Sequence, residues 1–307
     1  MRHWSAAQVR ARITVTDAAE AIRDALLREG KDDFEQPLRI SLGGGRVLVM
    51  PARQYSSGDA VIKILRVNSR EGRPPASGNT IDGVVMWLDG EGRPIWTADA
   101  AELTLVRTAA LVTLATDALA VAGATRLTIM GAGHQSDGMY TAVAAVRPIG
   151  QVTVWNRNAG PAEELAERLR AQTPGLQGLV EHDPDRAVAD AQVVCCATAS
   201  PEPLFAAAAL ALDTHINAIG SYRAGMREFS TEVTAAASVV AVDDADACCI
   251  ESGEIVDAIA ARVIDPGSLI ELPDLLREPV QRSGLTIFKS VGMAVADLAV
   301  TRLLIES

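Results

Sequence analysis

The sequence predicts an α/β protein in which a doubly wound, Rossmann-type parallel sheet is inserted in a second, α+β domain. Three observations predict this class. Strand-like segments with short turns fill residues 38–98, strands and helices alternate from residue 126 onward, and a turn with two glycines joins the first of these later strands to its helix. The expected domains are residues 1–110 together with 283–307, and residues 111–282.

The first expected domain begins with two helices within residues 1–30 and continues as a run of strands. Because turns and loops as short as these join neighbouring strands, the sheet should be antiparallel or mixed. A loop rich in Gly, Pro and Ser, residues 68–78, separates the third strand from the fourth. The expected strands are Leu38–Leu42, Arg46–Ala52, Ala60–Val67, Ile81–Asp89 and Pro94–Ala98.

The inserted domain follows a long helix, Glu102–Ala120. Two further helices, one ending at Arg147 and one over Pro161–Gln172, follow its first two strands, and another starts near Ala245. The chain should end as a strand over Leu285–Phe288 and a last helix. The expected strands of the insertion are Arg126–Met130, Gln151–Asn156, Gln192–Ala197, Thr214–Gly220 and Ser238–Asp243.

The turn after residue 130 has the features of a pyrophosphate-binding loop. Gly131 permits a tight turn and Gly133 lets a phosphate approach the backbone, while Ser136 stands where the usual pattern has a third glycine. The following helix directs its free N–H groups and the positive end of its dipole at the loop. We therefore expect a dinucleotide to contact Gly131, Ala132, Gly133, His134, Gln135 and Ser136.

The end of the second strand bears on which dinucleotide binds. An acidic residue there would hold the ribose hydroxyls of NAD, but this chain has Asn156, Arg157 and Asn158. Arg157 can pair with a 2′-phosphate, which a carboxylate would repel. The sequence thus favours NADPH, with NADH possible; the alternative for Arg157 is a solvated residue before a helix.

Composition excludes several classes of function. The net charge of −11 and the pI of about 4.9 argue against a nucleic-acid surface, and no apolar run is long enough to span a membrane. The N-terminus lacks the apolar core of a signal peptide, and the paired cysteines at 195–196 and 248–249 indicate buried filler in a reducing compartment, so we expect a cytoplasmic protein. His182 and His215 lack ligand spacing, and we expect no metal.

Three basic residues of the first domain interrupt apolar patterns. Lys63 shares a strand face with Val61 and Leu65, Arg107 lies on the apolar stripe of the long helix, and Arg39 lies in a short strand. Salt bridges to Glu102, Asp82 or Asp99 would explain each cation structurally. The three together favour a pocket for an anionic substrate, in which two arginines bind a carboxylate and the lysine donates a proton.

These residues fall in blocks that resemble the ornithine cyclodeaminase/mu-crystallin family. Residues 103–110 are similar to its L-T-x-x-R-T-A-A helix, and residues 131–136 to its G-A-G-x-Q-[AS] loop. Further similar blocks are residues 216–221, 252–254 and 287–294, so the similarity covers nearly the whole chain in order. Residues 155–157, Trp-Asn-Arg, resemble the strand end of mu-crystallin-like members that use NADPH.

The resemblance implies a homodimer in which each subunit has a substrate-binding and dimerisation domain besides the Rossmann domain. It also implies that Arg39, Lys63 and Arg107 bind substrate, with the two arginines on its carboxylate, and that Thr80 lines the pocket. Lys63 would be the catalytic residue. The further expected cofactor contacts are Ala197, Thr198, Ala199, Ser221 and Val291.

One departure from the family pattern bears on the reaction. Cyclodeaminases carry an aspartate two residues after the glycine of the I-N-A-x-G block, where this chain has Tyr222. A tyrosine carries no charge near neutral pH and cannot hold the distal amine of ornithine. The resemblance therefore implies a reductase of cyclic imino acids, the small-molecule partner being 1-pyrroline-2-carboxylate or its six-membered homologue. The alternatives are an ornithine or lysine cyclodeaminase, an amino-acid dehydrogenase, and a non-catalytic ligand binder.

Overall fold

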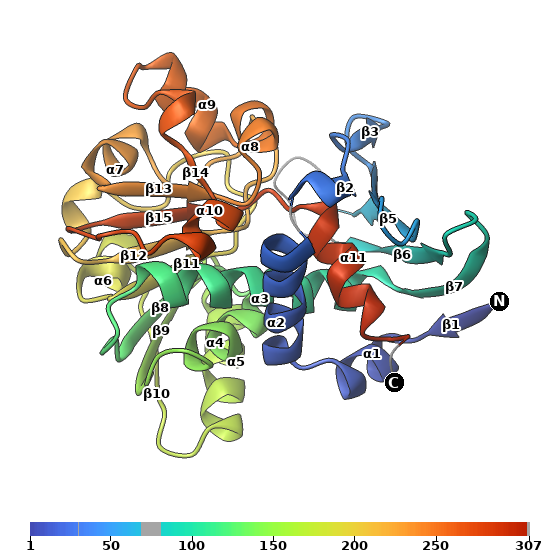
Figure 1. Ribbon diagram of the computed structural model, residues 1–307. Coiled ribbons are helices and arrows are strands. Elements are labelled where there is room, and N and C mark those ends of the chain that lie inside the picture. Colours follow the sequence, from blue (N-terminus) through green and yellow to red (C-terminus); the bar gives the residue numbers. More distant parts are fainter. Residues whose placement is uncertain (30, 69–80, 306–307) are drawn as a thin grey trace. The chain divides into compact units, whose positions relative to one another are not determined.

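The computed structural model describes residues 1–29, 31–68 and 81–305. The chain divides into two units, one of residues 1–111 and 293–307 and one of residues 112–292. Each unit has its own sheet (Figure 1). The long helix α3 (Ala100–Leu119) contributes its first part to unit 1 and its remainder to unit 2.

Unit 1 is built on a mixed sheet with the strand order β1-β7-β6-β5-β4-β2, and β3 also pairs with β4. Only β1 is parallel to its neighbour, β7, among the strands described in this sheet. The expected run of strands is thus present as a meander with short additions at its ends. The strands are β1 (Arg2–Trp4), β2 (Phe34–Glu35), β3 (Ile40–Leu42), β4 (Val47–Gln54), β5 (Ala60–Val67), β6 (Ile81–Leu88) and β7 (Pro94–Asp99).

The two faces of this sheet differ. On one face alternate residues of β5 are buried, and α11 (Ala294–Arg302) packs there on β4, β5 and α2 (Val15–Asp24) (Figure 1). The short helix α1 (Ala6–Arg12) contacts β7. On the other face four apolar residues lie in one cross-strand row, formed by Ile40, Val49, Ile64 and Val84. Ile40 and Ile64 are 53% and 39% exposed, so this row is open to contact.

Unit 2 holds a sheet with the order β10-β9-β8-β11-β12-β15-β13-β14, whose described pairs are all parallel. From β8 the chain adds β9 and β10 on one side and then β11 and β12 on the other, so the order of strand addition reverses between β8 and β11. The strands are β8 (Arg126–Met130), β9 (Gln151–Trp155), β10 (Gln177–Val180), β11 (Val193–Cys196), β12 (His215–Ala218), β13 (Val239–Val242), β14 (Ile270–Glu271) and β15 (Thr286–Lys289).

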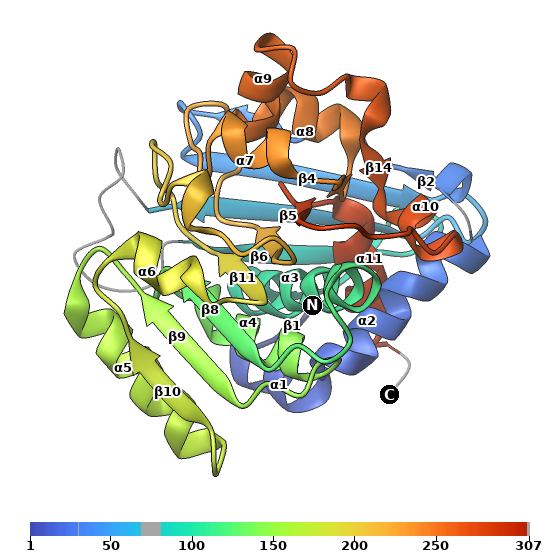
Figure 2. The same ribbon diagram turned by 90° about the vertical axis from the view of Figure 1, so that its left-hand side faces the viewer.

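Helices connect these strands, and α5 packs along β9 and β10 (Figure 2). The central strands and the helices after them bury one apolar cluster, which includes Val194, Ile216, Val242 and Ile287. The free thiols of Cys196 and Cys248 belong to the same cluster. The helices are α4 (Ser136–Ala144), α5 (Ala159–Gln172), α6 (Pro184–Ala189), α7 (Thr231–Ala236), α8 (Ala245–Glu251), α9 (Gly253–Ala260) and α10 (Leu272–Arg277).

The predicted α/β class is confirmed, whereas two details of the organisation differ. Residues 283–292 were expected in the first domain but lie in unit 2, because β15 is hydrogen-bonded between β12 and β13. The expected strands also did not include β10, a four-residue edge strand that pairs with β9. No helix in the described part of the chain is both long and apolar enough to cross a membrane.

Candidate functional site

In unit 1, Lys63 is a fully buried cation on the helix-covered face of the sheet. Its position on β5 lies between Met50 of β4 and Val85 of β6, both buried. The Nζ of Lys63 lies 2.6 Å from Oδ2 of Asp297, and the Asp297 side chain is fully buried on α11. A buried ammonium needs such a partner, since an unpaired charge in an apolar interior costs several kcal/mol.

The other two predicted cations lie close to this pair. Nε of Arg107 on α3 is 3.5 Å from Oδ1 of Asp297, so one carboxylate serves two cations. Arg39, just before β3, is partly exposed and near enough to act on Lys63 electrostatically. Burial lowers the pKa of Lys63 to about 7; Asp297 opposes that effect, while Arg107 and Arg39 reinforce it.

The acids that the sequence offered as partners have other roles. Glu102 binds Arg10 through two hydrogen bonds, Asp82 pairs with Arg66, and Oδ1 of Asp99 accepts a hydrogen bond from the Glu102 N–H at the start of α3. Sequence reasoning missed Asp297. Its signal was present, since it is a single acid in a helix whose residues 294–301 are otherwise apolar apart from Thr301.

In unit 2, the glycine turn has the shape that the sequence predicted. Gly131 has a φ of 109°, and a Cβ there would come within 2.9 Å of the Ala197 carbonyl oxygen, so a side chain would strain the turn. A Cβ at Gly133 would meet no atom within 4 Å, which leaves open space against the backbone. The turn ends where α4 begins, at Ser136.

The side chains of this turn retain unused hydrogen-bonding capacity. Among the described residues, His134 Nε2, both amide atoms of Gln135 and Ser136 Oγ are buried without a hydrogen-bond partner. Buried polar atoms are normally paired, so these atoms fit a bound polar ligand. The Ala132 N–H donates to Asn156 Oδ1 over 3.3 Å, which ties the turn to the end of β9. The turn therefore fits a dinucleotide phosphate.

Arg157 lies two residues after the end of β9 and is exposed, as are Asn158 and the first residues of α5. Asn156 is held by a second bond, from its Nδ2 to the Asn158 carbonyl oxygen over 2.9 Å. No acidic side chain occupies positions 156–158 at this strand end. The site is thus open to a phosphate, and the assignment of Arg157 to that role stays a prediction.

The remaining predicted cofactor residues lie at the carboxyl ends of the central strands. Ala197, Thr198 and Ala199 follow β11 and are partly exposed, whereas Ser221 follows β12 and is fully buried. Val291 follows β15 and is buried, and its N–H donates to Asp243 Oδ1 over 3.2 Å. Asp243 therefore holds the turn after β15, while the next residue, Asp244, caps α8.

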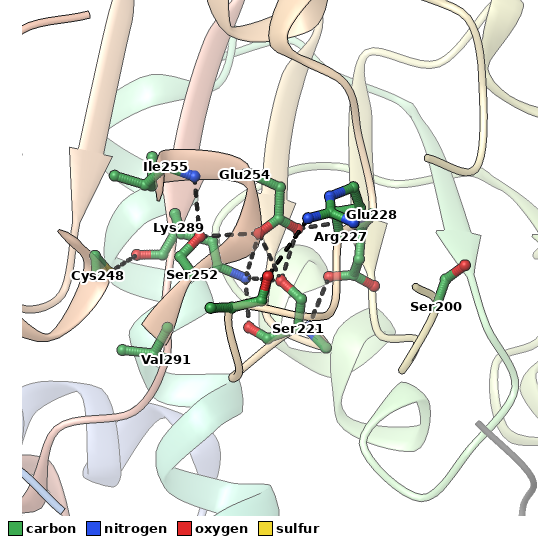
Figure 3. Close-up of polar contacts among 12 residues, drawn as sticks. Ser200, Ser221, Arg227, Glu228, Cys248, Ser252, Glu254, Ile255, Lys289 and Val291 are labelled. Atoms are coloured by element: carbon green, nitrogen blue, oxygen red, sulfur yellow. Dashed lines mark hydrogen bonds and ion pairs between the residues drawn. The ribbon is translucent and has the colours of Figure 1, made fainter. Parts of the chain in front are cut away.

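A buried polar network lies behind these strand ends (Figure 3). Glu228 accepts hydrogen bonds from Thr198 and Ser221, and Ser221 Oγ donates in turn to Glu254 over 2.6 Å. Lys289 Nζ donates to the Ser221 carbonyl oxygen over 2.6 Å. Ser221 is therefore hydrogen-bonded within the protein through its side chain and carbonyl oxygen, and its contact with a cofactor stays a prediction.

Thr80, the last predicted substrate residue, lies outside the described residues. Across the parts of the chain that are described, no group of three or more His, Cys, Asp and Glu side chains is arranged to hold a metal ion. His215 is instead buried between Thr286 and Asn217, and burial lowers its pKa to about 3.

Comparison with known proteins gives one consistent family. Residues 3–307 match the family described as Ornithine cyclodeaminase/mu-crystallin family. A Delta(1)-pyrroline-2-carboxylate reductase of Bacillus cereus is 32% identical over 268 residues, which cover 84% of this chain and 80% of the relative. The ketimine reductase mu-crystallin of Mus musculus is 29% identical over 277 residues, covering 89% of this chain and 85% of the relative.

Solved structures agree with the sequence comparison. The structure of Thermococcus litoralis Delta(1)-pyrroline-2-carboxylate reductase in complex with NADH and L-proline superposes with a TM-score of 0.90 at 25% identity. The match covers 100% of this chain and 97% of that one.

Proposed function

The chain belongs to the ornithine cyclodeaminase/mu-crystallin family, and on that premise we propose that it reduces a cyclic ketimine carboxylate with a nicotinamide cofactor. The substrate is 1-pyrroline-2-carboxylate, which gives L-proline, or 1-piperideine-2-carboxylate, which gives L-pipecolate. The reaction class is supported by the two relatives described above, which are named pyrroline-2-carboxylate reductase and ketimine reductase. The observation that carries the proposal is the buried Lys63, which shares one carboxylate with Arg107 in the neighbourhood of Arg39.

The proposed roles follow from charge. Two cations share Asp297, so the cluster attracts a further anion, and the planar guanidinium groups of Arg107 and Arg39 suit a substrate carboxylate. Binding that carboxylate fixes the position of the adjacent C=N bond. We assign the acid role to Lys63, whose pKa of about 7 lets it exchange a proton near neutral pH.

The reaction balances with one proton and one hydride. Lys63 Nζ gives its proton to the imine nitrogen and becomes neutral, and the protonated C=N bond then accepts a hydride at carbon. A bound reduced nicotinamide supplies that hydride. Asp297, 2.6 Å from Lys63 Nζ, favours the return of a proton to Lys63 from solvent.

We further propose NADPH as the preferred cofactor, with NADH as a weaker alternative. Arg157 lies exposed after β9 and no acidic residue occupies positions 156–158, which suits the 2′-phosphate. The Thermococcus relative was crystallised with NADH, so the family includes proteins that bind the form without this phosphate.

We propose a homodimer as the assembled form. Support comes from the open row of Ile40, Val49, Ile64 and Val84 on unit 1, because a contiguous apolar sheet face is a common contact surface. A second copy of the chain can bury the same row in a self-complementary contact.

The test of the reaction is a panel of cyclic and acyclic imino acids assayed for oxidation of NADPH and NADH by absorbance. We expect turnover with a cyclic imine and no ammonia from ornithine with oxidised cofactor alone. Ammonia release from ornithine would instead identify a cyclodeaminase, and oxidation of an amino acid as the preferred direction would identify a dehydrogenase. If the protein binds a dinucleotide but turns over no member of the panel, it would be identified as a non-catalytic ligand binder.

A further inference from the structure

Unit 2 buries two carboxylates and one ammonium together at one end of its sheet. Glu228, Glu254 and Lys289 are each at most 1% exposed. Lys289 Nζ lies 3.7 Å from Glu254 Oε2, and both groups bind Ser221 (Figure 3). Lys289 pairs with Glu254 and acts on Glu228 electrostatically, so the cluster is negative when both acids are ionised.

Glu228 fastens two neighbouring strand ends to each other. Its Oε1 accepts from the N–H and the hydroxyl of Thr198, over 2.6 and 2.9 Å, just after β11. Its Oε2 accepts from the N–H groups of Gly220 and Ser221, over 2.9 and 3.3 Å, just after β12. All four groups donate, as a carboxylate requires. A glutamine in place of Glu228 would find no acceptor for its NH₂ group among them except the Thr198 hydroxyl.

The fit around Glu228 is close. A Cβ at Gly220 would come within 2.6 Å of Glu228 Oε1 and 2.1 Å of the Thr198 nitrogen, so only glycine allows this approach. The backbone N–H of Glu228 donates to Glu254 Oε1 over 2.8 Å, which fixes the segment that carries it. The position of the Glu228 carboxylate is therefore fixed by close packing and by hydrogen bonds.

That position coincides with the edge of the sheet where a dinucleotide binds in this fold. β11 and β12 are adjacent and parallel, so their carboxyl ends open on the same edge, beside the reversal between β8 and β11. The oxidised nicotinamide ring carries a positive charge that the reduced ring lacks. A buried negative charge at this edge favours the oxidised ring and the positive charge that develops as hydride departs.

We propose that Glu228 is a positioning residue for the nicotinamide part of the cofactor, which fixes the ends of β11 and β12 and supplies a negative charge that favours the oxidised ring. This inference rests on the proposed function, because it requires a nicotinamide cofactor in unit 2. Glu228 acts through Thr198, Gly220 and Ser221, so it is distinct from the acid role assigned to Lys63.

The charge on Glu228 should depend on pH in the neutral range. Burial raises its pKa to about 7; Glu254 adds to that effect, while Lys289 and the N–H groups of Thr198 and Gly220 oppose it. Above this value the carboxylate is ionised and the oxidised cofactor is favoured. As the pH falls through it, the carboxyl gains a proton and that preference declines.

The experiment measures dissociation constants of NADP⁺ and NADPH by calorimetry for the wild type, Glu228→Gln and Glu228→Asp, at about pH 6 and about pH 8. At the higher pH we expect Glu228→Gln to weaken NADP⁺ roughly fivefold more than NADPH. Glu228→Asp keeps the charge and should recover most of the ratio. Glu232→Gln, at an exposed glutamate of α7, is the matched control and should match the wild type.

The outcomes separate this inference from the proposed function. A wild type that binds neither dinucleotide overturns the proposed function. A wild type that binds both, with a ratio that is equal at the two pH values and unchanged in Glu228→Gln, overturns the role of Glu228 alone. If Glu228→Gln does not fold, the wild-type ratio and Glu228→Asp still decide, since a ratio independent of pH contradicts the inference.

Discussion

Lys63 Nζ lies 2.6 Å from Asp297 Oδ2, and neither side chain is exposed to solvent. Lys63 comes from the middle of the unit 1 sheet and Asp297 from the last helix, so the end of the chain completes the charge balance of a strand near its start. Without Asp297, burial and the two arginines would all act to remove the proton from Lys63. The pair therefore keeps an acid available near neutral pH.

The pH dependence of imine reduction should reflect this lysine. The protonated, donating form of Lys63 predominates below about pH 7 and is lost as the pH rises through that value. Because kcat/KM reports on groups of the free enzyme, it should fall about tenfold per pH unit above the transition. Steady-state rates across the pH range check this. A profile that stays flat through neutral and alkaline pH would argue against Lys63 as the proton donor.

Replacing Asp297 by asparagine removes the carboxylate whose charge and hydrogen bond raise the Lys63 pKa. We expect the alkaline limb of the kcat/KM profile of Asp297→Asn to move to lower pH, and the free energy of unfolding to fall by about 3 kcal/mol because a buried pair is broken. Asp274→Asn, at an exposed residue of α10, is the control. A limb at the wild-type position in a folded Asp297→Asn protein contradicts the coupling.

Cofactor preference should depend on Arg157. We expect Arg157→Ala to lower kcat/KM with NADPH by roughly tenfold to a hundredfold and to leave the value with NADH within about twofold, since only NADPH carries the 2′-phosphate. Parallel assays with both cofactors give the ratio, and Arg277→Ala on α10 tests for a general effect of lost positive charge. Equal losses with both cofactors would remove Arg157 from the phosphate site.

The apolar row on unit 1 gives a prediction for assembly. Ile64→Glu places a charge in the row formed with Ile40, Val49 and Val84, and we expect it to convert a dimer to a monomer. Light scattering after size-exclusion chromatography gives the mass of each form. Ile95→Glu, at another exposed isoleucine outside the row, serves as control. A wild type that elutes as a monomer at micromolar concentration contradicts the proposed dimer.

Much of the fold could be predicted from local patterns. Most strands of the two sheets show in runs of apolar residues, and the turn at Gly131 shows in its glycines, because these features depend on neighbours in the sequence. β10 could not be predicted, since Gln177-Gly-Leu-Val has too few apolar residues to stand out and gains its order from pairing with β9. The place of β15 depends on long-range pairing in the same way.

In the candidate site, too, the features set by local sequence could be predicted and those set by long-range contacts could not. The cation on β5 and the cation on α3 could be found because each interrupts an apolar pattern. Their shared partner could not be assigned, because Glu102, Asp82 and Asp99 are nearer in sequence to these cations than Asp297 is and look equally suitable. The role of Glu228 could not be predicted from the sequence, because its four donors converge from two separate loops.

Lys63→Met tests the central claim most directly. Methionine keeps most of the length and the apolar body of the side chain while removing the ammonium group, so dinucleotide binding to unit 2 should be unchanged. We predict a loss of kcat of at least about a hundredfold with the best cyclic imine, together with a wild-type dissociation constant for NADPH measured on the same sample. Turnover within a few-fold of the wild type in that variant would contradict the account.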